Sequence, residues 1–179
     1  MARPVRRVVL GVTGSIAAVK APLIVRGLVK KGVEVRCVVT PNGERFAAPT
    51  ALAALSRAPV ARGAGDESLW EMAHLSLASW ADLILVAPAT ADMISRLAHG
   101  RAEGLLDALV LSARSRVAVC PAMDAEMWAH PATRANVRTI AGYGYAVWGP
   151  AKGELASGRV GVGRMLEPDE IVRRALKAA

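Results

Sequence analysis

The sequence predicts an α/β protein built on a Rossmann-like, doubly wound parallel sheet. Two observations lead to this prediction: apolar, β-branched runs recur along the chain, and stretches of helical periodicity separate them. Strands that are apolar on both faces indicate a sheet covered by helices on both sides, as in a flavodoxin-like three-layer sandwich. Ligands of such sheets bind beyond the carboxyl ends of the strands, so functional residues should follow the strands.

Each element is predicted from its local pattern. The strands are predicted at Val5–Leu10, Val33–Val39, Leu83–Ala87, Arg116–Cys120 and Tyr145–Trp148. The helices are predicted at Ser15–Lys31, Phe46–Ser56, Ala91–Ala98, Gly104–Ala113, Pro131–Gly142 and Pro168–Lys177. Ala58–Ser68 is expected to be an exposed loop. Gly149–Gly163 is too glycine-rich for a helix or a central strand, and we expect a mobile flap over about 149–165, although an ordinary surface loop has the same composition.

Composition narrows the class of protein. The 179 residues are expected to form a single domain, 1–179, and 53% hydrophobic with 21% charged residues is globular composition. No apolar run reaches the ~20 residues of a membrane span, and the N-terminus lacks the pattern of a signal peptide, so we expect a cytoplasmic protein without a membrane partner. The net charge of +8 is scattered, and with one Phe and two Tyr no stacking platform is visible. No nucleic-acid partner is therefore expected.

The cysteines and histidines do not form a metal-binding pattern. Cys37 and Cys120 lie in or at the end of β-branched runs, and we expect buried free thiols rather than a disulfide. The three histidines have no spacing typical of a zinc site, so no metal is expected.

A glycine turn follows the first predicted strand, in Gly11-Val-Thr-Gly-Ser-Ile-Ala17. The free N–H groups at the start of a helix, together with the positive end of its dipole, favour a phosphate, and Ser15 adds a hydroxyl. The next strand ends in Thr40 instead of the acidic residue that binds a dinucleotide ribose, so a mononucleotide fits better than NAD. An ordinary strand-to-helix turn would look similar.

Two further motifs follow later strands. In Ala87-Pro-Ala-Thr-Ala-Asp92, small residues leave room for a flat ring, and of Thr90 and Asp92 one is expected to cap the next helix. Pro121-Ala-Met-Asp-Ala-Glu-Met-Trp128 brings a carboxylate, two methionines and a tryptophan together. The alternative is structural: core filling by the apolar side chains, and Asp124 as the N-cap of a short helix.

His74, in Met-Ala-His-Leu, is the candidate general base, because its ordinary pKa lies near 6.5. A lone histidine is otherwise usually structural or exposed. The remaining motif is Gly153-Glu-Leu-Ala-Ser-Gly-Arg-Val-Gly-Val-Gly-Arg-Met165, inside the expected flap.

In this order the motifs resemble the homo-oligomeric flavin-containing cysteine decarboxylases, and among them the phosphopantothenoylcysteine decarboxylases of coenzyme A biosynthesis. The resemblance extends from about Arg7 to Val172. It implies FMN-dependent decarboxylation of 4'-phospho-N-pantothenoylcysteine to 4'-phosphopantetheine: the thiol is oxidised, carbon dioxide leaves, and the enethiol is reduced. A thiocarbonyl β to the carboxylate accepts the electrons that carbon dioxide leaves behind. The resemblance further implies a homotrimer or a dodecamer of trimers, and a phosphopantothenoylcysteine synthetase, fused or separate.

The resemblance also implies site residues. His74, Asp124 and Ser157 correspond to catalytic positions. The expected substrate contacts are Asp124, Met127, Glu154, Leu155 and Ala156. The expected FMN contacts are Gly14, Ser15, Ile16, Thr40, Phe46, Ala87, Pro88, Ala89, Thr90, Ala113 and Ala122, the first four of them near the phosphate.

The chain departs from the family pattern at two positions. Asp124 stands where the family has asparagine, and Ser157 where it has cysteine. An ionised aspartate only accepts hydrogen bonds, so Asp124 is protonated, contacts another group, or repels the substrate carboxylate, which would favour its loss. A serine hydroxyl is a far weaker acid than a thiol. Our hypothesis is that both steps still occur, with Asp124 or water supplying a proton.

Three other functions remain open. A peptidyl-cysteine decarboxylase that stops at the enethiol is favoured by Ser157 and disfavoured by the Gly-Glu-Leu-Ala flap. A flavin prenyltransferase is disfavoured by the Pro-Ala-Met-Asp motif and His74. A non-catalytic FMN-binding or regulatory subunit would have lost activity through the two substitutions.

Overall fold

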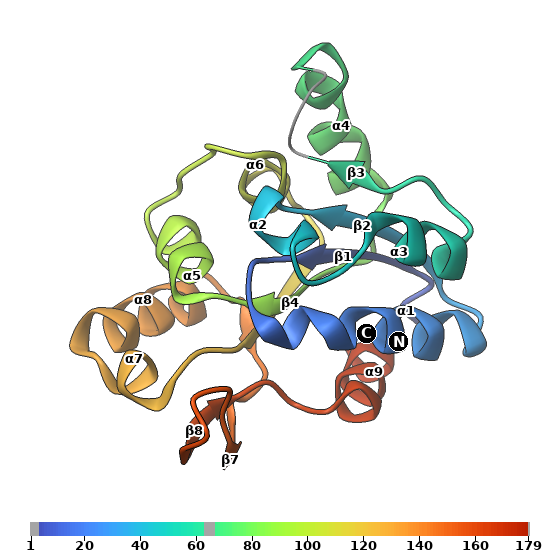
Figure 1. The fold of residues 1–179 in the computed structure, drawn as a ribbon. Helices are drawn as coiled ribbons and strands as arrows, with labels where there is room; N and C mark the ends of the chain where they lie inside the picture. Colours follow the sequence, from blue (N-terminus) through green and yellow to red (C-terminus); the bar gives the residue numbers. More distant parts are fainter. Residues whose placement is uncertain (1–3, 63–66, 179) are drawn as a thin grey trace.

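The predicted doubly wound sheet is confirmed. The computed structural model describes residues 4–62 and 67–178, and for 67–72 the backbone alone. Its main sheet has six parallel strands in the order β3-β2-β1-β4-β5-β6 (Figure 1). The strands are β1 Arg7–Val12, β2 Glu34–Val39, β3 Ala61–Arg62, β4 Leu83–Ala89, β5 Arg116–Pro121 and β6 Ala146–Val147.

Helices cover both faces of this sheet. Val8, Leu10 and Val12 of β1 pack into one apolar cluster with α1, α3 and α9, whereas Val9 packs into a second cluster with α4, α5, α6 and α8. This alternation follows from the two-residue period of a strand. The helices are η1 Ile16–Lys20, α1 Ala21–Lys30, α2 Pro41–Glu44, α3 Pro49–Ser56, α4 Glu67–Trp80, α5 Ala91–Ala98, α6 Leu105–Leu111, α7 Ala125–Ala129, α8 Pro131–Gly142 and α9 Pro168–Lys177.

The helix predictions differ from the structure mainly at the helix starts. Three helices, α5, α8 and α9, have the predicted bounds. The predicted helix Ser15–Lys31 divides into a 3-10 turn and α1, which has Pro22 in its first turn, where the missing N–H costs nothing. For the same reason the helix predicted from Phe46 begins only at Pro49.

The predicted loop Ala58–Ser68 is wrong at both ends. Ala61–Arg62 form β3 beside β2, and α4 begins at Glu67. Residues 63–66 of this prediction lie outside the described residues. The prediction failed because neither a two-residue strand nor a helix without a clear apolar stripe gives a periodic signal.

The glycine-rich segment forms an antiparallel hairpin of β7 Ala151–Glu154 and β8 Val160–Arg164. Its glycines permit close packing: a Cβ on Gly161 would lie 2.7 Å from the Cβ of Ala125. The hairpin projects from the bottom of the view in Figure 1, away from α4 at the top. The expected flap is therefore a regular element, and its mobility stays a prediction.

Two smaller expectations concern cysteine and membrane insertion. Cys37 and Cys120 are free and buried, as predicted. Burial raises the pKa of the Cys37 thiol to about 12. Within residues 4–62 and 67–178, no helix has the length and apolar character needed to cross a membrane.

Candidate active site

The loop from β1 to η1 meets the loop after β2 at the carboxyl edge of the sheet. A Cβ atom on Gly14 would lie only 2.5 Å from the Cβ of Asn42, so glycine alone fits this position. The Ser15 hydroxyl accepts a hydrogen bond from the Ala17 N–H at 3.3 Å and caps η1. Such a close backbone approach before a helix start is typical of phosphate-binding turns.

Thr40 directly follows β2 and is the N-cap of α2. Its Oγ1 accepts the Gly43 N–H at 3.1 Å, and its hydroxyl donates to the Val12 carbonyl at 3.3 Å. A phosphate contact at Thr40 therefore competes with two hydrogen bonds inside the protein, and this contact stays a prediction.

The end of β4 is tied to the β1 loop by Thr13, a residue that we did not predict. Its buried hydroxyl donates to the Pro88 carbonyl at 2.8 Å and accepts the Thr90 N–H at 3.2 Å. Ala87 and Ala89 are fully buried, backbone included, and line neither of the two cavities described below, so their contact with a ring stays a prediction. The loops after β1 and β4 are thus held as one rigid edge.

Of the two candidate caps for α5, Thr90 is the one used. Its Oγ1 accepts the Met93 N–H at 3.2 Å, whereas Asp92 forms an ion pair with Arg96 at 3.0 Å.

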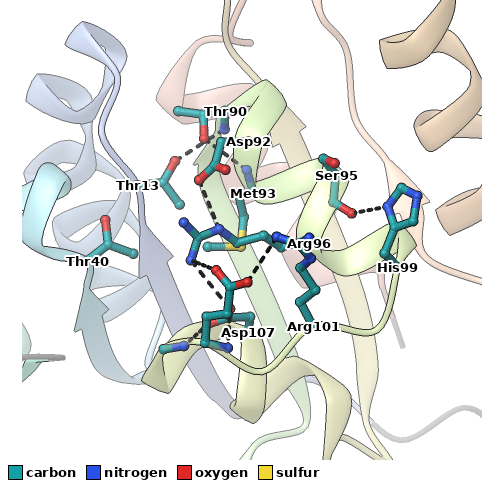
Figure 2. A network of polar contacts seen from close by, with 12 residues as sticks. Thr13, Thr40, Thr90, Asp92, Met93, Ser95, Arg96, His99, Arg101 and Asp107 are labelled. Atoms are coloured by element: carbon teal, nitrogen blue, oxygen red, sulfur yellow. Dashed lines mark hydrogen bonds and ion pairs between the residues drawn. The ribbon is translucent and has the colours of Figure 1, made fainter.

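A cavity of about 510 Å³ lies between this edge and α6. It is lined by Thr13, Gly14, Thr40 and Thr90, and by an ion-pair network centred on Arg96 (Figure 2). The network joins Arg96 to Asp92, Glu103 and Asp107, with the last at 3.7 Å. Asp107 is 2% exposed, and its carboxylate accepts the N–H groups of Glu103 and Gly104 at the start of α6. No local motif marks Arg96 or Asp107, because both lie inside helical stretches.

A second cavity, of about 560 Å³, lies between η1, the end of β5 and the hairpin. It brings together most of the residues that the sequence placed around flavin phosphate and substrate. These are Ser15, Ile16, Ala122, Asp124, Glu154, Leu155, Ala156 and Ser157. Both cavities have the size of small-molecule sites, and they meet the same carboxyl edge of the sheet.

Asp124 and Ser157, the two departures from the family pattern, contact each other directly. The Ser157 hydroxyl donates to Asp124 Oδ2 at 2.7 Å. The same carboxylate accepts the Glu126 N–H at 3.4 Å as the N-cap of α7. Hydrogen bonding to Glu126 and Ser157, assisted by the Arg159 cation, lowers the pKa of Asp124 to about 2. Of the three alternatives for Asp124, the structure shows the contact with another group, and the lowered pKa leads us to expect that the carboxyl is ionised.

We expect a carbon-13 NMR titration of the Asp124 carboxyl to give a midpoint near 2, below the ordinary 3.8. Because the folded-state pKa is depressed, the hydrogen bond from Ser157 is fully present above 3.8 and is lost as the pH falls through about 2. Ser157→Ala should raise the midpoint, whereas Ser79→Ala on α4 should leave it unchanged. A wild-type midpoint at or above 3.8 would contradict the ionised contact.

The hairpin is docked on the segment after β5 by further contacts. The Met123 N–H donates to the Gly163 carbonyl at 3.0 Å, and Arg159 forms an ion pair with Glu126 at 2.7 Å. A Cβ on Gly163 would lie 2.1 Å from the Met123 carbonyl oxygen. Docking of the hairpin therefore requires glycine at 163 as well as the polar contacts.

Ten of the predicted site residues do not line the second cavity, and Gly14, Thr40 and Thr90 among them line the first. Met127, half exposed, lines the first cavity instead. Six predicted residues line neither cavity, as the described residues form them: His74, Phe46, Ala87, Pro88, Ala89 and Ala113. His74 lies on α4, at the opposite end of the view in Figure 1 from the hairpin. One protomer thus does not bring His74 together with Asp124 and Ser157.

Metal ligation has no structural support in the part of the chain that the structure describes. There, no group of three or more histidine, cysteine, aspartate or glutamate residues is arranged to hold an ion.

Comparison with known proteins identifies the family. The flavoprotein family model matches residues 2–178. The chain belongs to the flavoprotein family. This confirms the predicted relationship to the flavin-containing cysteine decarboxylases.

Curated relatives give a more specific likeness. The chain is 44% identical over 168 residues to the coenzyme A biosynthesis bifunctional protein CoaBC of Vibrio cholerae, covering 93% of this chain and 42% of that protein. It is 42% identical over 172 residues to CoaBC of Escherichia coli K12, covering 96% of this chain and 42% of that one. The chain thus spans less than half the length of these relatives.

Solved flavoprotein structures agree with this likeness. A mutant PPC decarboxylase complexed with pantothenoylaminoethenethiol has a TM-score of 0.84 and 30% identity, covering 97% of this chain and 96% of that one. The FMN-dependent cysteine decarboxylase SpaF has a TM-score of 0.76 and 31% identity, covering 96% of each chain.

Proposed function

We propose that this chain is an FMN-dependent decarboxylase domain, 1–179, that converts 4'-phospho-N-pantothenoylcysteine to 4'-phosphopantetheine in cytoplasmic coenzyme A biosynthesis. The observation that supports this most is the second cavity, in which Ser15 and η1 face Asp124 and the hairpin. The relatives named CoaBC and the complexed PPC decarboxylase supply the substrate class.

The residues at the sheet edge fit a flavin mononucleotide. The loops after β1 and β2 approach so closely at Gly14 that this part of the turn presents backbone rather than a side chain. The two cavities at the sheet edge give room for cofactor and substrate. Gly14, Ser15, Ile16 and Thr40 would hold the phosphate. Residues 87–90 and Ala122, with Ala113 and Phe46, would hold the ring. When bound, FMN would supply the two-electron oxidation of the substrate thiol and the return of those electrons.

The side chains of the second cavity would orient the substrate and act on the charge of its carboxylate. Ionised Asp124 repels a carboxylate placed beside it, and this repulsion is relieved when carbon dioxide leaves. Glu154, Leu155 and Ala156 on the hairpin would cover the substrate and exclude water. Ser157, whose proton is hydrogen-bonded to Asp124, would protonate the product only with help from that carboxylate or from water.

His74 would act as the general base, contributed by a neighbouring subunit. Because α4 lies opposite the hairpin in Figure 1, a site containing both requires a second copy of the chain. A homotrimer, or a dodecamer of trimers, is the assembly we propose. A phosphopantothenoylcysteine synthetase, fused or separate, is the proposed partner, since the relatives are bifunctional proteins more than twice as long as the matched region.

We expect the purified protein to be yellow, to release FMN on denaturation, and to convert 4'-phospho-N-pantothenoylcysteine to phosphopantetheine. The measurement is the mass of the product, together with carbon dioxide release. A product two hydrogens lighter than phosphopantetheine would show that the reaction stops at the enethiol. A colourless protein that does not bind added FMN in a calorimeter would overturn the proposal.

A second candidate is a peptidyl-cysteine decarboxylase that stops at the enethiol, favoured by the hydroxyl at Ser157 in place of a thiol. Carbon dioxide release from a peptide ending in cysteine, without release from phosphopantothenoylcysteine, would select it.

A further inference from the structure

The charged side chains of the first cavity form one cluster around Arg96. Its Nε pairs with Asp92 at 3.0 Å, and its Nη1 lies 3.3 Å from Glu103 and 3.7 Å from Asp107. The carboxylates of Asp92 and Asp107 flank the guanidinium on two sides (Figure 2). Among the described residues that line this cavity, the members of the cluster are the charged ones. One cation among three carboxylates gives the cavity wall a formal excess of negative charge.

Burial decides which of these charges acts most strongly on a ligand. Asp107 is 2% exposed, and its carboxylate accepts the Glu103 N–H at 3.0 Å and the Gly104 N–H at 2.9 Å. The side chain of Asp92, by contrast, is 69% exposed. Water and salt screen an exposed charge strongly and a buried charge much less. Asp107 therefore contributes the largest part of the field inside the cavity, and its hydrogen bonds hold it in place.

The same cavity is lined by residues that the proposed function assigns to FMN. Gly14 and Thr40 would contact the phosphate, and Thr90 would contact the ring. Thr90 is also the N-cap of α5, the helix that carries Asp92 and Arg96. Because the carboxylates repel a phosphate and the N–H groups of the glycine turn attract it, the ring is the part of FMN that would lie toward the cluster.

We infer that the Arg96 cluster lowers the reduction potential of the bound flavin. This inference rests on the proposed function. Reduction by two electrons places negative charge on the flavin ring near neutral pH, and charges beside the ring change how readily it accepts electrons. An excess of negative charge at the cavity wall opposes the added charge. The flavin therefore takes up electrons less readily and returns them more readily.

A low potential suits a site that has Ser157 in the hairpin. In the proposed reaction the substrate gives up a hydride from carbon and a proton from sulfur, carbon dioxide leaves, and the enethiol takes up a hydride and a proton. Ser157 is a weaker acid than a thiol, so the last protonation is the difficult one. A flavin that returns its electrons readily offsets this difficulty. The cluster would thus favour completed reduction over release of the enethiol.

The test is a spectroelectrochemical titration of bound FMN. Asp107→Asn should raise the potential, changing the equilibrium between oxidised and reduced flavin by about 10-fold, or ~30 mV for a two-electron couple. Asp92→Asn should raise it by about 2- to 3-fold, because its charge is more screened. Arg96→Met should lower it. Asp169→Asn on α9 and Arg26→Met on α1 remove exposed charges outside the cavity and should leave the potential unchanged.

Two further measurements separate electrostatics from structural damage. Loss of the Asp107 carboxylate removes part of the cap of α6, so Glu103→Gln, a change at a more exposed position, provides a second rise in potential that does not depend on the cap. Arg96→Lys keeps the charge and should keep the wild-type potential. In Asp107→Asn, a larger fraction of the product should be two hydrogens lighter than phosphopantetheine, as measured by mass.

Two outcomes would overturn the inference. Potentials that match the wild type in Asp107→Asn and Arg96→Met, with FMN retained, would show that the cluster does not act on the flavin. Shifts of the same sign in both variants would assign the cluster to the shape of the cavity. If the wild type binds FMN but releases no carbon dioxide from 4'-phospho-N-pantothenoylcysteine, the proposed function fails, and the potentials still decide the role of the cluster.

Discussion

His74→Asn should abolish most carbon dioxide release while the protein keeps its FMN. The expected loss is about 10²- to 10⁴-fold in kcat, the usual contribution of a general base. The assay is carbon dioxide release from 4'-phospho-N-pantothenoylcysteine, with flavin content measured by absorbance. Asparagine can hydrogen-bond but does not take up a proton near neutral pH, so binding should suffer less than catalysis.

The matched control for this substitution is His99→Asn, because His99 is exposed and its Nδ1 contacts the Ser95 carbonyl that precedes it by one helical turn. This control should retain wild-type activity. Unchanged activity in His74→Asn would remove His74 from the mechanism.

Gly163→Ala should detach the hairpin and cause a loss of activity nearly as large. The new methyl group would lie 2.1 Å from the Met123 carbonyl oxygen, a backbone atom that cannot turn aside. Overpacking of this kind costs about 1–3 kcal/mol of folding stability. The clash is removed if the hairpin moves away from Met123. FMN binding should persist, because the β1 and β4 loops do not include the hairpin. Activity assays and hydrogen exchange of 151–164 measure the effect.

Gly142→Ala is the control for a simple loss of glycine, since no atom lies within 4 Å of a Cβ at that position. It should change neither activity nor hairpin exchange. Wild-type activity in Gly163→Ala would show that docking of the hairpin is not needed for turnover.

The two variants also test the assembly. If His74 of one subunit serves the hairpin site of another, mixed oligomers of His74→Asn and Gly163→Ala chains would contain some intact sites. Activity regained on mixing two inactive preparations would support a site shared between subunits, whereas a site within one chain would regain none.

The fold was predictable because each long strand is a run of apolar residues that can be recognised from the local sequence. The apolar runs of β2 and β4 lie close to their predicted bounds, and helices with proline at the start and a strong apolar stripe, such as α9, have the bounds expected. The failures have physical causes. Helix α4 has only a weak apolar stripe, so its periodic signal is small. The hairpin is rich in glycines that allow close contact with residues 123–125, and no local pattern reveals contacts between segments so far apart.

The site was predictable where residues directly follow strands and not where helices contribute side chains. Asp124 and Ser157 could be placed from motifs, but their mutual hydrogen bond depends on how the hairpin docks. Arg96 and Asp107 were not predicted because each is an ordinary charged residue in a helical stretch, and the ion pair between them joins two separate helices.

The sheet ends in very short strands on both sides, and this has a consequence for how copies of the chain behave at high concentration. The border strands β3 and β6 pair over only two residues each, and Arg62 on β3 is engaged by Glu44. A long, flat border would offer a row of open amide and carbonyl groups to another molecule, which is the usual route to fibrous aggregates. Here the apolar strands β1 and β4 lie in the middle of the sheet, where neighbouring strands pair with them on both sides. They are therefore not open to pairing with another molecule.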